Sequence, residues 1–175
     1  MTLHYFVAMN FEIEKEVRLK INLTPEEILS KYGDSLKSEM EGQLYDILST
    51  IFSSLVGIKK IIVPGDFKSN KGHKAVNCSV KAAEGYLFPL KSSLVFIHKP
   101  VIYLRHNELR HIEFSRTGAG VSRTFDLTLT KLKDDQNITF LSIDRDEHNI
   151  LVQYFKQAGV KMKTVDTEGN RAELQ

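Results

Sequence analysis

The sequence predicts a mainly β protein with helices, an α+β fold made of two modules in tandem. Three observations predict it. Seven short strand-like runs begin at residue 75, one amphipathic helix closes that series, and a hairpin with a long helix precedes it. At 175 residues, with 42% apolar and 26% charged residues, the chain fits one large or two small domains with a core of their own.

The N-terminal third begins with a predicted hairpin and a short helix. Residues 3–11 and 16–23 alternate or run apolar around an acidic bend. Thr24-Pro25-Glu26-Glu27 then predicts a helix start, with a Thr N-cap, a Pro at the first helical position and a Glu that can close a capping box. We expect this helix to end near Gly33.

A second, longer helix is predicted between Asp34 and Gly57. Apolar residues recur at helical spacing from Leu36 to Leu55, and the glycine stands where a C-terminal cap belongs. Residues 61–63 then predict a short strand, and residues 66–74 have the polar, Gly-containing composition of a linker.

The strand-rich part is the basis of the fold prediction. Its alternation is clearest at Phe125, Leu127 and Leu129. Asp144 to Glu147 can form another capping box, before an apolar helix stripe that ends at Gly159. The predicted strands are 75–81, 85–90, 94–97, 101–105, 109–115, 121–132 and 137–143.

Seven strands followed by one helix is the layout of a pleckstrin-homology module, a bent antiparallel sandwich or barrel capped by a C-terminal helix. The N-terminal third then corresponds to the rear part of another copy, whose first strands would precede Met1. The expected organisation is residues 1–65 as the rear part of a first module, incomplete at its N-terminus, 66–74 as a linker, 75–165 as a second module and 166–175 as a tail.

Charge is balanced overall but not along the chain. Residues 1–56 carry 5 basic and 9 acidic side chains, residues 57–123 carry 12 and 4, and residues 124–175 carry 7 and 9. A basic segment of this kind favours nucleic acid, anionic lipid or an acidic protein as partner, although a solvated surface explains it equally well.

The sequence carries no motif for catalysis or for a cofactor. No nucleophile elbow, phosphate-binding glycine loop or zinc-binding helix motif occurs, so we expect no enzyme, no catalytic residue, no metal and no cofactor. A single cysteine and no secretory signal indicate a reducing compartment. No apolar window is long enough for a membrane span.

Four strings then carry a family resemblance: residues 61–69 (IIVPGDFKS), 81–90 (KAAEGYLFPL), 96–100 (FIHKP) and 122–127 (SRTFDL). Together they resemble the middle domain of the small subunit of FACT, a heterodimeric histone chaperone whose small subunit is called the structure-specific recognition protein. The resemblance extends in order from about Tyr5 to Val165. It implies tandem pleckstrin-homology modules in a nuclear, chromatin-bound, non-enzymatic protein.

The implied partners are core histones, the large FACT subunit through regions outside this chain, and DNA, with no membrane contact. The implied activity is help with nucleosome disassembly and reassembly in transcription, replication and repair. The open alternatives are a phosphoinositide-binding module and the middle domain of a related double-module histone chaperone. The lipid alternative lacks the usual cations, because Lys91 is followed by two serines.

Two sets of charged residues are the candidate contacts, and each set can equally be solubilising surface. Aromatics between the cations would favour single-stranded nucleic acid, but strand periodicity predicts that most of Phe67, Tyr86, Phe88 and Tyr103 are core. The basic candidates for histones or DNA are Lys68, Lys71, Lys74, Lys91, Lys99, Arg105, Arg110, Arg116 and Arg123. The acidic candidates for basic histone segments are Glu26, Glu27, Asp34, Glu39, Glu41 and Asp46.

Overall fold

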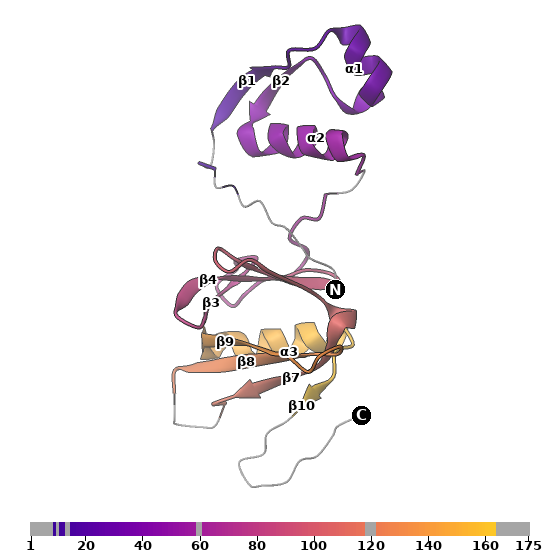
Figure 1. Ribbon diagram of the computed structural model, residues 1–175. Coiled ribbons are helices and arrows are strands. Elements are labelled where there is room, and N and C mark those ends of the chain that lie inside the picture. Colours follow the sequence, from indigo (N-terminus) through magenta and orange to yellow (C-terminus); the bar gives the residue numbers. More distant parts are fainter. Residues whose placement is uncertain (1–8, 10, 13–14, 59–60, 118–121, 164–175) are drawn as a thin grey trace. The chain divides into compact units, whose positions relative to one another are not determined.

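The chain forms two compact units, residues 1–62 and residues 63–175, shown in a computed structural model (Figure 1). The structure describes residues 9, 11–12, 15–58, 61–117 and 122–163. Each unit has its own sheet and its own helices, and each is described by itself below.

In the first unit, β1 (Glu16–Lys20) pairs antiparallel with β2 (Glu39–Gln43), and α1 (Pro25–Tyr32) lies between them in the sequence. The predicted helix start is confirmed. The Thr24 backbone N–H donates to Glu27 Oε2 at 2.8 Å, and the Glu27 N–H donates to Thr24 Oγ1 at 3.2 Å. This reciprocal pair satisfies two N–H groups that a helix start leaves without partners.

The second helix is shorter than predicted, because α2 covers only Leu44–Val56. The prediction of a helix from Asp34 was wrong: residues 39–43 pair with β1, and Gly42 has φ 143°, which a side chain would resist. The predicted C-cap is present, since Gly57 adopts the left-handed conformation. The other predicted hairpin strand, residues 3–11, lies mostly outside the described residues.

The second unit contains an eight-stranded sheet in the order β10-β7-β8-β9-β3-β4-β5-β6. All neighbours are antiparallel except β10 and β7. The strands are β3 (Val76–Val80), β4 (Ala83–Pro89), β5 (Ser93–Ile97), β6 (Ile102–Arg105), β7 (Leu109–Ser115), β8 (Thr124–Lys131), β9 (Asn137–Asp144) and β10 (Met162–Lys163). The seven strands predicted between 75 and 143 are confirmed as β3 to β9. The strand predicted at 61–63 was wrong, since these residues are exposed and join no ladder in the described structure.

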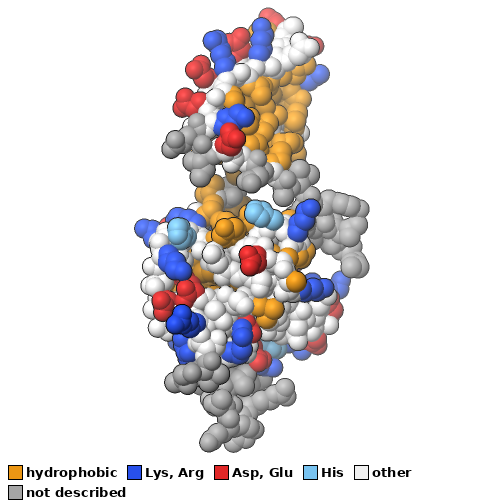
Figure 2. Space-filling view, turned by 90° about the vertical axis from the view of Figure 1, so that its left-hand side faces the viewer, with side chains coloured by type: hydrophobic (Ala, Val, Ile, Leu, Met, Phe, Trp, Pro, Cys, Tyr) orange, Lys and Arg blue, Asp and Glu red, His pale blue; other side chains and the backbone are white. Residues whose placement is uncertain are grey.

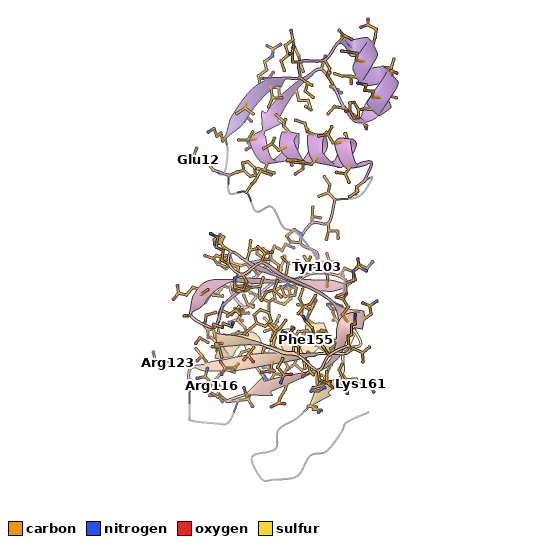
Figure 3. The ribbon with its side chains drawn as sticks, viewed as in Figure 1. Glu12, Tyr103, Arg116, Arg123, Phe155 and Lys161 are labelled. Atoms are coloured by element: carbon orange, nitrogen blue, oxygen red, sulfur yellow. The ribbon has the colours of Figure 1, made fainter. Side chains whose placement is uncertain are left out.

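The core of the second unit lies between the curved sheet and α3 (His148–Gln157) (Figure 1). Leu151 and Phe155 of α3 are fully buried, together with Phe125 and Phe140 of the sheet. The alternating residues of β8 therefore face this core, as their period of two predicts. Figure 3 shows Phe155 inside the unit, between the parts of the sheet.

The capping box predicted before α3 was wrong. Asp144 accepts a hydrogen bond from the Asp146 N–H at 3.3 Å, but short 3-10 turns at 145–147 precede the helix. Glu147 is buried, and its Oε2 instead accepts from the Asn70 N–H at 2.7 Å. The Glu147 carboxylate thus binds a backbone N–H far away in the sequence, not the start of the helix that follows it.

The segment 66–74, predicted as a linker, makes specific contacts with the second unit. The Phe67 ring packs edge-on against Tyr154 with centroids 5.7 Å apart. Ser69 is buried, and its hydroxyl accepts from the His73 N–H at 3.1 Å. These contacts fix the turn that leads into β3.

Candidate binding surfaces

Three of the nine candidate cations form ion pairs. Lys71 Nζ lies 3.1 Å from Asp144 Oδ2, Arg110 Nε lies 2.9 Å from Asp135 Oδ1, and Arg116 pairs with the mostly buried Asp126. The hydrogen bond from Lys71 lowers the pKa of the Asp144 carboxyl. The three carboxylates partly neutralise these cations, which makes them weaker attractors of an anionic ligand.

The turn between β7 and β8 brings two predicted cations to one side of the second unit, Arg116 and Arg123 (Figure 3). Acidic groups accompany both. Strand pairing sets Ser115 opposite Asp126 and Thr124 opposite Asp144. This turn therefore carries mixed charge rather than a continuous basic surface.

The other candidate cations are exposed and make no ion pair within the described ranges. Lys91 lies in the β4–β5 turn, Lys99 in the β5–β6 loop and Arg105 at the end of β6, while Lys68 precedes β3. Lys74 donates to the Gly65 carbonyl oxygen at 2.6 Å. Lys81 in the β3–β4 turn is equally exposed, although it is not among the predicted contacts.

Three of the four aromatic candidates lie on the outer face of the sheet, contrary to the prediction that most are core. Pairing of Phe88 with Val95 and of Val95 with Tyr103 sets these side chains on one face, and Tyr86 shares that face as Phe88's neighbour at i−2. Leu87 and its paired residue Phe96 are fully buried and fill the core. Tyr86 is 45% exposed, whereas Phe88 and Tyr103 are partly buried.

All six acidic candidates are exposed on the first unit, but two have structural roles. Glu27 closes the helix cap, and these hydrogen bonds lower its pKa. Glu39 lies 2.9 Å from Arg18 and 3.9 Å from Lys20. No ion pair within the described part of the chain involves the remaining four, which are Glu26, Asp34, Glu41 and Asp46.

The first unit also exposes an apolar groove of about 370 Å³ along α2. Figure 2 shows hydrophobic side chains gathered on this unit. Only Ile28, Leu36 and Ile47 are buried there, so the described part of this unit has a small core. The groove is lined by residues that include Met9, Phe11, Tyr45, Leu48, Phe52 and Val56.

The single cysteine, Cys78, is buried in β3. Burial raises the pKa of the Cys78 thiol to about 12, so this cysteine is a poor nucleophile at neutral pH. Across residues 15–58, 61–117 and 122–163, no cluster of His, Cys, Asp or Glu has the makings of a metal site. The helices within those ranges are also too short or too polar to cross a bilayer.

The described architecture is that of a pleckstrin-homology-like α+β protein, with an antiparallel curved sheet closed by a C-terminal helix. Residues 74–164 match the model of the middle domain of Rttp106-like histone chaperones, and residues 1–61 match the model of the SSRP1 PH domain. The chain belongs to the family of Rttp106-like histone chaperone middle domains.

Curated relatives agree with this assignment across both units. The chain is 38% identical over 165 residues to "FACT complex subunit POB3" of Debaryomyces hansenii, covering 93% of this chain and 30% of the relative. It is 36% identical over 173 residues to "FACT complex subunit SSRP1" of Dictyostelium discoideum, covering 96% and 32%. It is 32% identical over 169 residues to the Saccharomyces cerevisiae subunit POB3, covering 95% and 30%. The chain thus spans about a third of the length of these relatives.

Proposed function

We propose that this chain is a non-enzymatic histone-binding module of a FACT-type chaperone, acting on chromatin in the nucleus. The observation that carries the proposal is that family matches cover both units and that relatives named as FACT subunits align with 93% and 96% of the chain. In this proposal the module binds core histones while nucleosomes are disassembled and reassembled. The large subunit of the complex joins through regions outside this chain.

The first unit supplies the physical basis for histone contact. Core histones carry strongly basic segments, which are attracted to carboxylates that are exposed and lack a partner cation. Glu26, Asp34, Glu41 and Asp46 meet that description, whereas Glu27 and Glu39 are held by a cap and by ion pairs. We therefore assign histone attraction to the first four residues and a structural role to the other two.

A titration of fluorescently labelled core histones with this chain at several salt concentrations tests the proposal. Saturable binding that persists near physiological salt is expected. Reversing Glu26, Asp34, Glu41 and Asp46 to lysine should weaken it about tenfold or more and reduce its salt dependence.

The matched control reverses four exposed acids of the second unit, Asp66, Glu84, Asp134 and Asp146, which should leave histone affinity nearly unchanged. Equal weakening by both sets would mean that net charge, not this surface, attracts histones. Sedimentation with phosphoinositide vesicles but no histone binding would replace the proposal with a lipid-binding function.

A further inference from the structure

Thr24 is the single serine or threonine of the sequence that a proline follows directly. The four prolines come after Thr24, Val63, Phe88 and Lys99. Thr24 is exposed, and it lies in the first unit between β1 and the start of α1 (Figure 1). Proline-directed protein kinases select such a hydroxyl, because their substrate clefts accept a proline in the next position. The Thr24 hydroxyl therefore meets the local sequence requirement of such a kinase.

The backbone at Thr24 has the extended conformation in which a kinase cleft binds its substrate. Its φ is −70° and its ψ is 155°, and the helix begins only at Pro25. A residue before proline avoids helical dihedral angles because it would clash with the proline ring, so Pro25 itself keeps Thr24 extended. On the other side of the hydroxyl, α1 has eight residues and buries only Ile28, so its first turn can open locally at low cost.

The first turn of α1 offers a phosphate on Thr24 two backbone N–H donors. Pro25 has no N–H group, and the Ile28 N–H already donates to the Thr24 carbonyl oxygen at 3.0 Å. The N–H groups of Glu26 and Glu27 remain, and the Glu27 N–H already donates to Thr24 Oγ1 at 3.2 Å. A phosphate bonded to Oγ1 would lie beside these donors, where the partial positive charge of the helix end favours an anion.

The Glu27 carboxylate holds this position in the unmodified chain. Its Oε2 accepts from the Thr24 N–H at 2.8 Å, and the hydrogen bonds with Thr24 lower the pKa of the Glu27 carboxyl. A phosphate would bring about 1.5 to 2 negative charges to Oγ1, next to this carboxylate, and the two anions would repel each other. The phosphate would therefore take over the cap, and the Glu27 carboxylate would leave it.

We propose that Thr24 is a phosphorylation site for a proline-directed kinase and, resting on the function proposed above, that its phosphate strengthens the attraction of histones to the first unit. The modification adds the phosphate charge beside Glu26 and frees Glu27, which the unmodified chain holds in its cap. Basic histone segments then meet more uncompensated negative charge, which raises both the affinity and the salt dependence of binding.

The phosphoryl group comes from ATP, which the kinase binds. The bond between Thr24 Oγ1 and the γ-phosphorus forms while the bond from that phosphorus to the β–γ bridging oxygen breaks. ADP leaves, and the hydroxyl proton passes through the catalytic base of the kinase to solvent. The chain itself supplies only the nucleophilic hydroxyl, so it remains a substrate and not an enzyme in this step.

Treatment of the full chain with a purified cyclin-dependent kinase and ATP, followed by mass spectrometry of its peptides, tests the site. We expect a single phosphate, on Thr24. Thr24→Ala should abolish it, but this variant also removes the helix cap. Pro25→Ala is therefore the second variant, because it keeps the hydroxyl and the capping pair and removes the residue that the kinase selects. It should lose most of the phosphate, whereas Thr24→Ser should keep it.

Titration of labelled core histones with the phosphorylated and the unmodified chain tests the effect of the phosphate. Phosphorylation should tighten binding about fivefold and make it more sensitive to salt, and phosphatase treatment should reverse both changes. Pro25→Ala taken through the same kinase reaction is the matched control, and its affinity should stay at the value of the unmodified chain. In an NMR titration, the pKa of the Glu27 carboxyl should rise on phosphorylation, because the hydrogen bonds that lower it are lost.

The proposal is overturned if the kinase leaves Thr24 unmodified, if Pro25→Ala is phosphorylated as well as the wild type, or if the phosphorylated chain binds histones no more tightly. An unchanged pKa of Glu27 would refute the displacement of its carboxylate from the cap. Histone binding by the unmodified chain in these cases leaves the proposed function standing. If neither form binds histones, the proposed function fails, and the effect assigned to the phosphate fails with it.

Discussion

Removing one hydroxyl, by Tyr154→Phe, is expected to destabilise the second unit markedly. The Tyr154 hydroxyl donates to the Leu90 carbonyl oxygen at 2.8 Å, with Ser93 O at 3.2 Å, and it lies 2.7 Å from His106 Nε2. Since Ser93 O also accepts from the Leu90 N–H at 2.9 Å, the substitution chiefly leaves Leu90 O and His106 without this partner. A buried polar group left unsatisfied costs about 1 to 3 kcal/mol, so we expect a loss of about 2 kcal/mol.

Thermal unfolding measures this loss. The chain contains no tryptophan, so far-UV circular dichroism is a suitable probe. A loss of about 2 kcal/mol corresponds to a midpoint lowered by roughly 8 °C for a unit of this size. Tyr86→Phe is the control, because its hydroxyl makes no hydrogen bond in the described structure, and its midpoint should not change. Equal midpoints for Tyr154→Phe and wild type would refute the assignment of this hydroxyl as the link between α3 and the β4–β5 turn.

Burial lowers the pKa of His106 below its ordinary 6.5, so the unfolded chain binds more protons there than the folded chain. The contribution of His106 to the free energy of unfolding should be fully present above pH 6.5 and should decline as the pH falls toward the lowered pKa. His106→Gln should therefore make the thermal midpoint fall less steeply at acid pH. A pH profile equal to that of the wild type would contradict this prediction. Gly85→Ala should lower the free energy of unfolding in urea by about 3 kcal/mol, because its Cβ would overlap the Ile97 carbonyl oxygen and lie 2.6 Å from Phe96 Cζ. A stability equal to that of the wild type would show that β4 and β5 can move apart to make room for the methyl group. Phe125→Ala should cost about 3 to 5 kcal/mol, since this ring is 1% exposed, and an unchanged midpoint would place it outside the core.

Local signals in the sequence were sufficient for most elements. The Thr24–Glu27 box, the left-handed Gly57 and the strands of the second unit each depend on neighbours a few residues away, and the structure contains all of them. The strand Glu39–Gln43 was missed because its paired residues in β1 lie 19 to 27 positions earlier and the helical spacing of nearby apolar residues continued through it. Pairing across that distance overrode local periodicity.

Side-chain partners were harder to predict than elements. Glu147 fits the third position of a capping box, yet its carboxylate accepts from Asn70, 77 residues away. Likewise, Arg116 and Lys71 count as basic in any window of sequence, but folding brings them to Asp126 and Asp144. Such partners depend on which strands become neighbours, and residue spacing does not determine that.

The same effect changes how a run of cations should be interpreted. The basic segment 57–123 looks uniform, but Lys71, Arg110 and Arg116 form ion pairs. The lysines beside β4, β5 and β6 form none in the described structure, and the exposed acid Glu84 lies on β4 among them. The ion pairs of Lys71 and Arg110 are exposed and contribute little to stability, whereas Arg116 pairs with the mostly buried Asp126. The aromatic side chains differ from the prediction too. Periodicity predicted that most of Phe67, Tyr86, Phe88 and Tyr103 are core, whereas the register turns all but Phe67 to the outer face. Strand register and long-range ion pairs, rather than net charge, therefore decide which of these side chains remain accessible to a partner.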